Sequence, residues 1–375
     1  MTASPFDATT LLEGLRRWVE IESPTNDAAA VNRMMDAVEA EAREFGARIT
    51  RIPGRDGVGD HLLVASPWGE EDEAGILILS HLDTVHDIGT LAGPLPYRVE
   101  GGAAFGPGIY DMKGGAYLAF AAMREVLTGD ERTALPIRYL FIADEEVGSL
   151  TGRAHIEREA RRAKYVLVPE PMRDGKVVTA RKGVARFCMT ITGQPAHSGG
   201  RHEDGRSAVK EMAHQILRLE AMTDYASGLT VNVGVVRGGT RANVVPAEAV
   251  LDIDMRFPSA ALGDAAVEAI MKTLPQGPDI TLTVTGGITR PAFEKTAGAA
   301  ALLEHARGLA AEIGFTIGDY ASGGGSDGNF TAPIAPTLDG IGVDGKGPHT
   351  HFEQASIASL VPQARLHLRL LQTLS

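Results

Sequence analysis

Gly75-Ile76-Leu77-Ile78-Leu79-Ser80 is a continuous apolar run that leads directly into His81-Leu82-Asp83. Such a run is typical of a strand that is buried on both faces of a sheet. Residues 137–143 and 165–168 have the same character, and helical patterns occupy 113–127 and 153–162. Because strands that alternate with helices usually form one layered sheet, the sequence predicts an α/β domain. Its central sheet is expected to be mostly parallel, with flanking helices.

A second pattern begins after about residue 182. It predicts four strands and two helices, in the order 184–192, helix 207–220, 229–236, 247–257, helix 262–274 and 280–284. Strand-helix-strand-strand-helix-strand is the ferredoxin-like order of an α+β domain. The α/β character returns near residue 297. We therefore predict a catalytic domain of residues 1–181 and 291–375, which is interrupted by a smaller ferredoxin-like domain at 182–290.

The composition excludes several classes of protein. The 375 residues are 44% hydrophobic and 22% charged with a net charge of −12, which is typical of a globular chain and disfavours binding to nucleic acid or to an anionic membrane. Cys188 is the only cysteine, so a thiolate metal cluster is excluded, and its apolar surroundings favour a core position. Residues 1–5 lack the features of a signal peptide, and we expect a cytoplasmic protein.

Polar residues gather where the predicted strands end. In an open α/β sheet, ligands bind outside the carboxyl ends of the strands. The residues at these positions are imidazoles and carboxylates: His81 and Asp83 after the first run, Glu145 and Glu146 after the second, Glu170 after the third, Asp111 where a loop enters a helix, and His349 near the C-terminus.

Each of these residues alone has an ordinary structural interpretation. His81 fits a core histidine, Asp111 a helix cap, and Glu145-Glu146 a solvated turn. Together they form the ligand set that suits Zn²⁺, with Mn²⁺ or Co²⁺ as alternatives. Two metals bridged by one aspartate lower the pKa of a shared water and polarise a carbonyl. In the adjacent pair of glutamates, one carboxylate can bind metal while its neighbour transfers the water proton.

The same motifs resemble those of a known family. Ser80-His81-Leu82-Asp83, Asp111-Met112-Lys113-Gly114-Gly115, Asp144-Glu145-Glu146, Glu170 and the segment 349–353 are similar to the metallopeptidase family of acetylornithine deacetylase, succinyl-diaminopimelate desuccinylase and bacterial glutamate carboxypeptidase. Segments 193–199 and 238–246 are similar as well, in the order of that family. The resemblance covers nearly the whole chain. It implies a two-metal amide hydrolase in which a hydroxide shared by the metals attacks the amide.

The resemblance assigns roles to the metal-site residues one by one. His81, Asp111 and Glu170 would hold one metal, and Asp111, Glu146 and His349 the other, so that Asp111 bridges the two. Glu145 matches the general base. Asp83 matches the carboxylate that orients the ligating histidine, for which there is also a physical reason.

The resemblance also assigns roles to the inserted domain. It implies a lid that forms a homodimer and supplies His197 to the partner's site, where the imidazole stabilises the oxyanion. Asn243 and Arg256 match residues that hold the free carboxylate of a small-molecule substrate, and Arg offers a bidentate fork for this purpose.

Two further segments, 287–293 and 322–329, resemble the glutamate carboxypeptidase branch. This implies that Arg290 anchors the C-terminal carboxylate, and Lys176 is a weaker candidate for the side-chain carboxylate of the substrate. The expected substrate is an N-acyl or peptidyl amino acid that ends in Glu or Asp. An N-acyl-amino-acid deacylase of the acetylornithine or succinyl-diaminopimelate type is the alternative.

A serine hydrolase is a remote rival. Gly324-Gly325-Ser326-Asp327-Gly328 fits the G-x-S-x-G pattern, and Asp339 or Asp344 and then His349 follow in the hydrolase order. No clear strand precedes the glycines, however, and this reading leaves the strand-end carboxylates unexplained.

Overall fold

The computed structural model describes residues 5–70 and 72–375, and the chain divides into two compact units. The large unit contains the chain up to Thr179, Lys295–Ser322 and Ser326–Ser375. The small unit contains Ala180–Glu294 and Gly323–Gly325. The predicted boundaries at 182 and 290 lie two and four residues from these limits of the small unit.

The large unit is built on a mixed sheet. Within the described residues its eight strands lie in the order β1 (Arg48–Ile52), β2 (His61–Ala65), β6 (Ile137–Ile142), β3 (Gly75–His81), β7 (Ala163–Val168), β14 (Thr337–Asp339), β8 (Lys176–Arg181) and β13 (Gly318–Ser322). The four central strands β6, β3, β7 and β14 are parallel, whereas β1, β2 and β8 pair antiparallel with their neighbours. The predicted α/β class is confirmed, and the expected parallel pairing describes the centre of the sheet.

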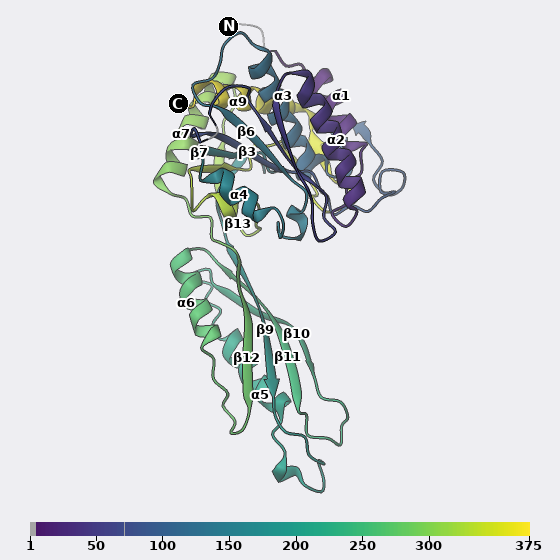
Figure 1. Cartoon of the computed structure of the whole chain (residues 1–375), viewed down its shortest axis with the longest axis vertical. Helices are drawn as coiled ribbons and strands as arrows, with labels where there is room; N and C mark the ends of the chain where they lie inside the picture. The colour runs from purple at the N-terminus through teal and green to yellow at the C-terminus, as the bar shows by residue number, and fades with distance from the viewer. Residues whose placement is uncertain (1–4, 71) are drawn as a thin grey trace. The chain divides into compact units, whose positions relative to one another are not determined.

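Strand β3 is buried along its whole length, as the apolar run predicts. Ile76 and Ile78 belong to the larger core, and Leu77 and Leu79 to the core on the opposite face. Figure 1 shows helices on both faces of this sheet. The larger core packs against α1 (Ala8–Val19), α2 (Ala28–Glu44), α3 (Gly114–Thr128), α7 (Ala297–Ile313) and α9 (Ile357–Thr373), and the other against α4 (Arg153–Ala160) and α8 (Gly328–Thr331).

A small antiparallel sheet lies in the same unit. Its strands, in the order β15 (Gly345–Lys346), β16 (Gln354–Ser356), β5 (Ala103–Phe105) and β4 (Arg98–Glu100), come from segments far apart in the sequence. Gln354 pairs with Phe105 in this sheet. The pairing therefore brings the segment near residue 349 to the segment that leads into residue 111.

The small unit has the predicted ferredoxin-like topology. Its elements are β9 (Gly183–Thr192), α5 (Ala208–Glu220), β10 (Thr230–Gly238), β11 (Glu248–Phe257), α6 (Ala260–Met271) and β12 (Thr281–Arg290). The sheet is antiparallel with the order β10-β11-β9-β12 (Figure 1). Alternate residues of β11 are buried in the core with α5 and α6. Cys188 lies half-buried outside that core, so its predicted core position is wrong.

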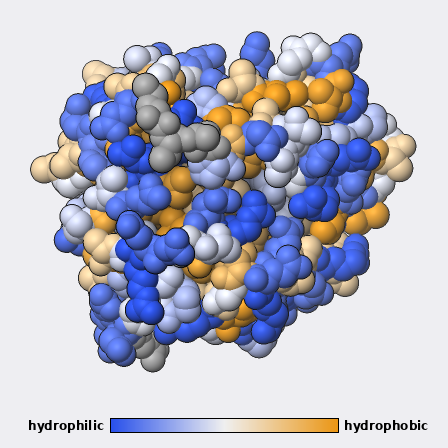
Figure 2. Space-filling model, turned by 90° about the horizontal axis from the view of Figure 1, so that it is seen from above, coloured by the Kyte–Doolittle hydropathy of each residue, from blue (hydrophilic) through white to orange (hydrophobic). Residues whose placement is uncertain are grey.

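Helices in the described part of the chain lack the combination of length and apolar character that crossing a membrane requires. Figure 2 shows one face of the molecule, where hydrophilic residues predominate and hydrophobic residues form small groups between them.

Candidate metal centre

Three neighbouring strands deliver the first group of side chains. His81 is the last residue of β3, Glu170 follows β7, and Glu145 and Glu146 begin η2 (Glu145–Val147), a short 3₁₀ helix that follows β6. Because β6, β3 and β7 are parallel neighbours, their carboxyl ends meet at the same edge of the sheet.

The small antiparallel sheet delivers the other two side chains. Asp111 lies in η1 (Ile109–Lys113), an irregular turn that opens α3, and His349 lies in the turn between β15 and β16. His349 has a φ of 61°, which is uncommon for a residue other than glycine. The imidazole itself is half-exposed.

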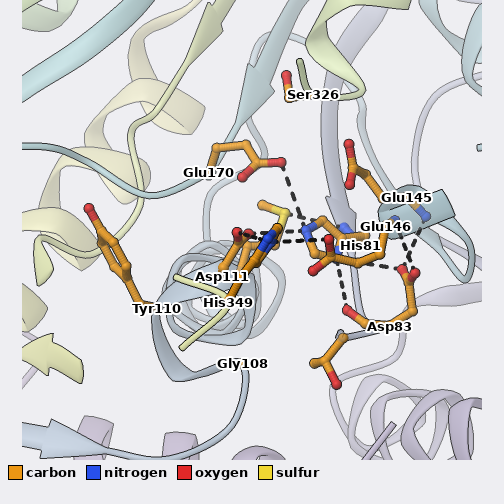
Figure 3. Close-up of polar contacts among 12 residues, drawn as sticks. His81, Asp83, Gly108, Tyr110, Asp111, Glu145, Glu146, Glu170, Ser326 and His349 are labelled. Carbon is orange, nitrogen blue, oxygen red and sulfur yellow. Dashed lines mark hydrogen bonds and ion pairs between the residues drawn. The ribbon is translucent and has the colours of Figure 1, made fainter. Parts of the chain in front are cut away.

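These side chains converge on Asp111 (Figure 3). Its Oδ1 lies 3.3 Å from Nε2 of His81, and its Oδ2 lies 3.2 Å from Nε2 of His349. Nε2 of His349 is also 3.2 Å from Oε2 of Glu146, and Nε2 of His81 is 3.9 Å from Oε1 of Glu170. Each oxygen of the Asp111 carboxylate thus faces a different imidazole, as a bridging ligand would.

The close packing of these groups shifts several of their pKa values. Burial opposes ionisation of Asp111, but hydrogen bonds from His349 and His81 hold its pKa below the usual range. Hydrogen bonds to Asp111 and Glu146 raise the pKa of His349 to about 10. Burial raises the pKa of Glu146 to about 7 and, together with the charge of Asp111, raises the pKa of Glu170. The raised pKa values favour the protonated forms of Glu146, Glu170 and His349. Bound cations could replace these protons and neutralise the carboxylates.

The donor set fits a divalent metal. Ligand atoms of His81, Asp111 and Glu146 lie within 4.8 Å of one another. Among the described residues, Oε1 of Glu146 is buried without a hydrogen-bond partner, which is costly unless a cation satisfies it. Neutral imidazole and carboxylate are the ligands that zinc and related ions accept in proteins.

Asp83 organises the backbone next to this cluster. Its carboxylate accepts hydrogen bonds from the N–H groups of Glu145 and Glu146, both at 3.2 Å, and from the Thr25 hydroxyl at 2.7 Å. Nδ1 of His81 lies 2.9 Å from the carbonyl oxygen of Asp83 and 3.5 Å from its carboxylate. The carbonyl thus fixes the ring so that Nε2 faces Asp111, while the carboxylate mainly holds η2.

Glu145 lies beside the cluster in Figure 3. Its negative charge contributes to the raised pKa values of Glu146 and Glu170. This position suits a group that exchanges a proton with a water near the candidate metal ligands.

Glu353 is a part of the site whose role the sequence did not indicate. Its fully buried carboxylate accepts hydrogen bonds from the N–H groups of Gly108 at 3.0 Å, Tyr110 at 2.8 Å and Asp111 at 2.9 Å. Nε2 of His86 lies 2.7 Å from the same carboxylate. Glu353 therefore shapes the turn that presents Asp111.

His197 and Asn243 lie on paired loops of the small unit. Ser198 N–H donates to the Asn243 carbonyl at 3.1 Å, and His197 forms an isolated bridge with Val244. Nδ1 of His197 accepts the N–H groups of Gly199 and Gly200 at 3.1 and 3.2 Å. A neutral His197 therefore carries its proton on Nε2, where it can donate.

The predicted carboxylate-binding residues have different surroundings. Nε and Nη2 of Arg256 donate to the Asp254 carboxylate at 2.7 and 3.1 Å. These two hydrogen bonds occupy one edge of the guanidinium. Arg290 is buried at the end of β12. Lys176 is exposed at the start of β8 in the large unit.

Strand β13 ends directly before the glycine run, so the expectation that no strand precedes the glycines is wrong. The contacts of Ser326 are nevertheless structural. Its hydroxyl is buried, donates to Asp339 at 2.5 Å and accepts the Gly328 N–H at 3.0 Å. A serine nucleophile donates instead to a histidine. Since Nε2 of His349 faces Asp111 and Glu146, these contacts do not support the serine hydrolase.

Comparison with known proteins identifies relatives across the whole chain. The model of the family described as Peptidase family M20/M25/M40 matches residues 77–373. Carboxypeptidase G2 from Pseudomonas sp. is 32% identical over 375 residues, which covers 98% of this chain and 89% of that protein. A succinyl-diaminopimelate desuccinylase from Albidiferax ferrireducens is 26% identical and covers 73% of each chain.

Solved structures show the same fold. Aminopeptidase PepT from Bacillus cereus superposes with a TM-score of 0.78 at 24% identity, covering 98% of both chains. A dinuclear metal binding peptidase of family M20 from Bacillus subtilis gives a TM-score of 0.71 at 15% identity, covering 98% of this chain and 99% of the other.

Proposed function

The chain belongs to peptidase family M20/M25/M40, and on that premise we propose that it is a two-metal carboxypeptidase that releases C-terminal glutamate or aspartate from N-acyl or peptidyl conjugates. The observation that carries the proposal is the convergence of two imidazoles on opposite oxygens of Asp111. His81, Asp111 and Glu170 would hold one ion. Asp111, Glu146 and His349 would hold the other, with Zn²⁺ as the expected metal.

The chemistry that the bound metal supplies is Lewis-acid polarisation of the amide carbonyl and easier deprotonation of water. Glu145 takes the proton from that water and passes it to the leaving amine. Asp83 supports this exchange, because its carboxylate holds the backbone of Glu145 and Glu146. A base on a fixed backbone keeps its proton-transfer distance from one turnover to the next.

Residues of the small unit are proposed to bind the substrate. Arg256 and Asn243 would hold the free carboxylate, with Arg290 as a further anchor. The Asp254 carboxylate supports Arg256 by orienting its guanidinium through two hydrogen bonds. His197 would stabilise the oxyanion, and the fixing of its Nδ1 by two backbone N–H groups supports a role as donor through Nε2.

We propose further that the protein is a homodimer in which His197 acts in the partner's site. The test mixes two inactive variants, Glu145→Gln and His197→Ala, under conditions that exchange subunits. Half of the randomly formed dimers would contain one site with both residues, so about a quarter of the wild-type activity should return. Mixtures that stay inactive although the subunits exchange would contradict the role of His197 in trans.

A substrate panel tests the identity of the leaving group. We would measure amine release by the metal-loaded protein from N-acyl derivatives of glutamate, aspartate, ornithine, diaminopimelate and neutral amino acids. The relationship to carboxypeptidase G2 supports a preference for glutamate or aspartate. Preference for ornithine or diaminopimelate would instead support the deacylase alternative, to which the related desuccinylase points.

A further inference from the structure

A chain of buried polar side chains is attached to the turn that carries Glu145. Its members are His61, the first residue of β2, Asp144, directly before η2, and Thr151, shortly before α4. All three are at most 4% exposed. Buried polar groups in a folded protein normally satisfy one another by hydrogen bonds. Here the hydrogen bonds connect the start of β2 to both ends of the turn.

The hydrogen bonds run in one direction along this chain. Nδ1 of His61 accepts the Ala143 N–H at 3.1 Å, so a neutral ring carries its proton on Nε2. Nε2 then donates to the Thr151 hydroxyl at 3.1 Å, and that hydroxyl donates to Oδ2 of Asp144 at 2.9 Å. Burial lowers the pKa of His61, which favours the neutral ring. Each group therefore orients the next one.

The position of the Asp144 carboxylate depends on Thr151. Its Oδ2 accepts the backbone N–H of Thr151 at 2.6 Å in addition to the hydroxyl. Its Oδ1 is buried and has no hydrogen-bond partner among the described residues. Loss of the Thr151 hydroxyl would therefore leave the carboxylate with the backbone N–H as its one donor in the described part of the chain.

The turn between Asp144 and Thr151 closes around Glu145. The Ser149 N–H donates to the Asp144 carbonyl at 2.8 Å, and the Gly148 N–H donates to the Glu145 carbonyl at 2.8 Å. The Asp83 carboxylate accepts the Glu145 N–H at 3.2 Å (Figure 3). The backbone of Glu145 is thus held directly by Asp83 and, through the residue before it, by the buried chain.

We propose that His61 is a positioning residue, which acts through Thr151 and Asp144 to hold Glu145 at its proton-transfer distance. This inference rests on the proposed function, because it assumes that Glu145 is the base. A displacement of about 1 Å at a reacting group can lower turnover about 10²-fold. The expected signature is therefore a fall in kcat without a matching change in KM.

The first test compares Thr151→Val with Thr151→Ser in the full chain, with N-benzoylglutamate as substrate and saturating Zn²⁺. Valine resembles threonine in shape but lacks the hydroxyl, whereas serine keeps it. We expect Thr151→Val to lower kcat about 10–100-fold with KM within about twofold and the metal content unchanged. Thr151→Ser should retain kcat within about threefold of the wild type. Equal kcat values in the two variants would contradict the role of the hydroxyl.

Thr337→Val is the matched control. Thr337 is also buried, and its hydroxyl donates to the Ala335 carbonyl at 2.9 Å and lies 3.0 Å from the Thr331 hydroxyl. It begins β14, which is parallel to β7, so it lies at the edge of the sheet opposite to the candidate metal centre. The control should be less stable in chemical denaturation but keep kcat within about twofold. A loss of kcat as large as that of Thr151→Val would show a general effect of buried hydroxyls and overturn the proposal.

The second test changes His61 itself and does not require Thr151→Val alone to fold. The longer amide in His61→Gln can place an N–H near the position of Nε2 and donate to Thr151, whereas the amide in His61→Asn is too short. We expect His61→Asn to lower kcat about 10–100-fold and His61→Gln to lower it no more than about threefold. Wild-type kcat in His61→Asn would overturn the positioning role.

The double variant His61→Asn/Thr151→Val shows whether the two residues act through one chain. Its kcat should lie within about threefold of that of the weaker single variant, whereas independent effects would multiply and overturn the chain. The wild type separates this inference from the proposed function. A metal-loaded wild type that cleaves no N-acylglutamate would overturn the proposed function and the positioning role with it. An active wild type with unchanged kcat in both single variants would overturn the positioning role alone.

Discussion

Glu145 is the side chain on which turnover should depend most strongly. It lies beside the proposed metal ligands, and a carboxylate there can exchange a proton with water and with the leaving amine. We expect Glu145→Gln to lower kcat by about 10²–10⁴-fold, because the amide cannot accept the proton. The measurement is steady-state amide hydrolysis together with the metal content of the purified variant.

The metal content decides how this result is understood. Glu145→Gln should bind as much metal as the wild type, and Glu13→Gln on the exposed surface of α1 should change neither quantity. Turnover close to that of the wild type would remove Glu145 as the base. Loss of metal in the variant would make Glu145 a ligand instead.

Glu353 should matter for metal binding without contacting the metal. We expect Glu353→Gln to weaken metal binding about 10–100-fold, because its amide cannot accept all the hydrogen bonds that position Asp111. Competitive titration of the metal-free protein with a chelating dye measures this. Glu211→Gln is the matched control, since Glu211 is also buried and accepts the N–H groups of Gln276 and Gly277, but in the small unit. Similar metal affinities for both variants and the wild type would contradict the positioning role.

The types and places of the proposed ligands could be predicted from the sequence, whereas their support could not. His81 and Glu170 stand directly after apolar runs, so the rule that strand ends meet at one edge applies to them. Glu353 accepts backbone N–H groups of residues more than 240 positions away, and nothing in its neighbours along the chain indicates this. The pairing of Arg256 with Asp254, by contrast, agrees with the predicted strand, because residues two positions apart in a strand lie on the same face.

The start of α3 packs closely against the segment that carries Glu170. A Cβ added to Gly115 would lie 1.9 Å from the Pro169 carbonyl oxygen, so backbone would have to move. We expect Gly115→Ala to lower the free energy of unfolding by about 1–3 kcal/mol through overpacking. Gly308→Ala in α7 should instead raise it by about 0.5–1 kcal/mol, because alanine loses less backbone freedom than glycine in a helix and its Cβ meets nothing within 4 Å. Chemical denaturation measures both, and equal effects would contradict the close packing.

Helix α9 carries a histidine that should make stability sensitive to acid. His367 is buried with its ring nitrogen Nε2 3.1 Å from the Ile341 carbonyl oxygen. Burial lowers its pKa to about 4, so the folded state favours the neutral ring. In the unfolded chain, His367 has the ordinary histidine pKa of about 6.5 and therefore binds a proton below that pH. The folded chain keeps His367 neutral down to about pH 4, so the free energy of unfolding falls between these two pH values.

We expect the titration of His367 to lower the free energy of unfolding by about 2 kcal/mol between pH 7 and pH 4.5. The comparison is chemical denaturation of the wild type and His367→Gln, both in chelator so that metal release does not enter. The variant should lose less stability than the wild type over this interval. Parallel pH profiles would show that His367 does not titrate as described.

Long elements were predictable and short ones were not. The buried run of β3 and the order of elements in the small unit follow from periodicity alone. The small sheet of β15, β16, β5 and β4 has strands of two or three residues, too short to produce a pattern, although it brings His349 to Asp111. The predicted strand 280–284 also ended too early, because Gly286 and Gly287 suggest a turn. Gly286 instead lets β12 pass close to β9, where a Cβ would lie 2.1 Å from the Arg186 carbonyl oxygen.

For the whole molecule, the fold class and the family could be predicted because the motifs extend over the length of the chain. The details of the sheet could not. Strands β1 and β2 are joined by the segment 53–60, which is too short for a parallel crossover, and they therefore form an antiparallel extension. We propose that the two units have different roles. The large unit binds metal and performs proton transfer, and the small unit binds the substrate carboxylate.

The decisive measurement is the hydrolysis of N-benzoylglutamate by the full chain after metal removal and again after titration with Zn²⁺ or Mn²⁺. We expect activity to disappear with the metal and to return as the chain takes up two equivalents, with the Ser326→Ala variant following the same curve if it folds. Activity that survives complete metal removal would contradict the metal centre built on Asp111. If that residual activity were lost in Ser326→Ala with the fold intact, the reaction would belong to the serine instead.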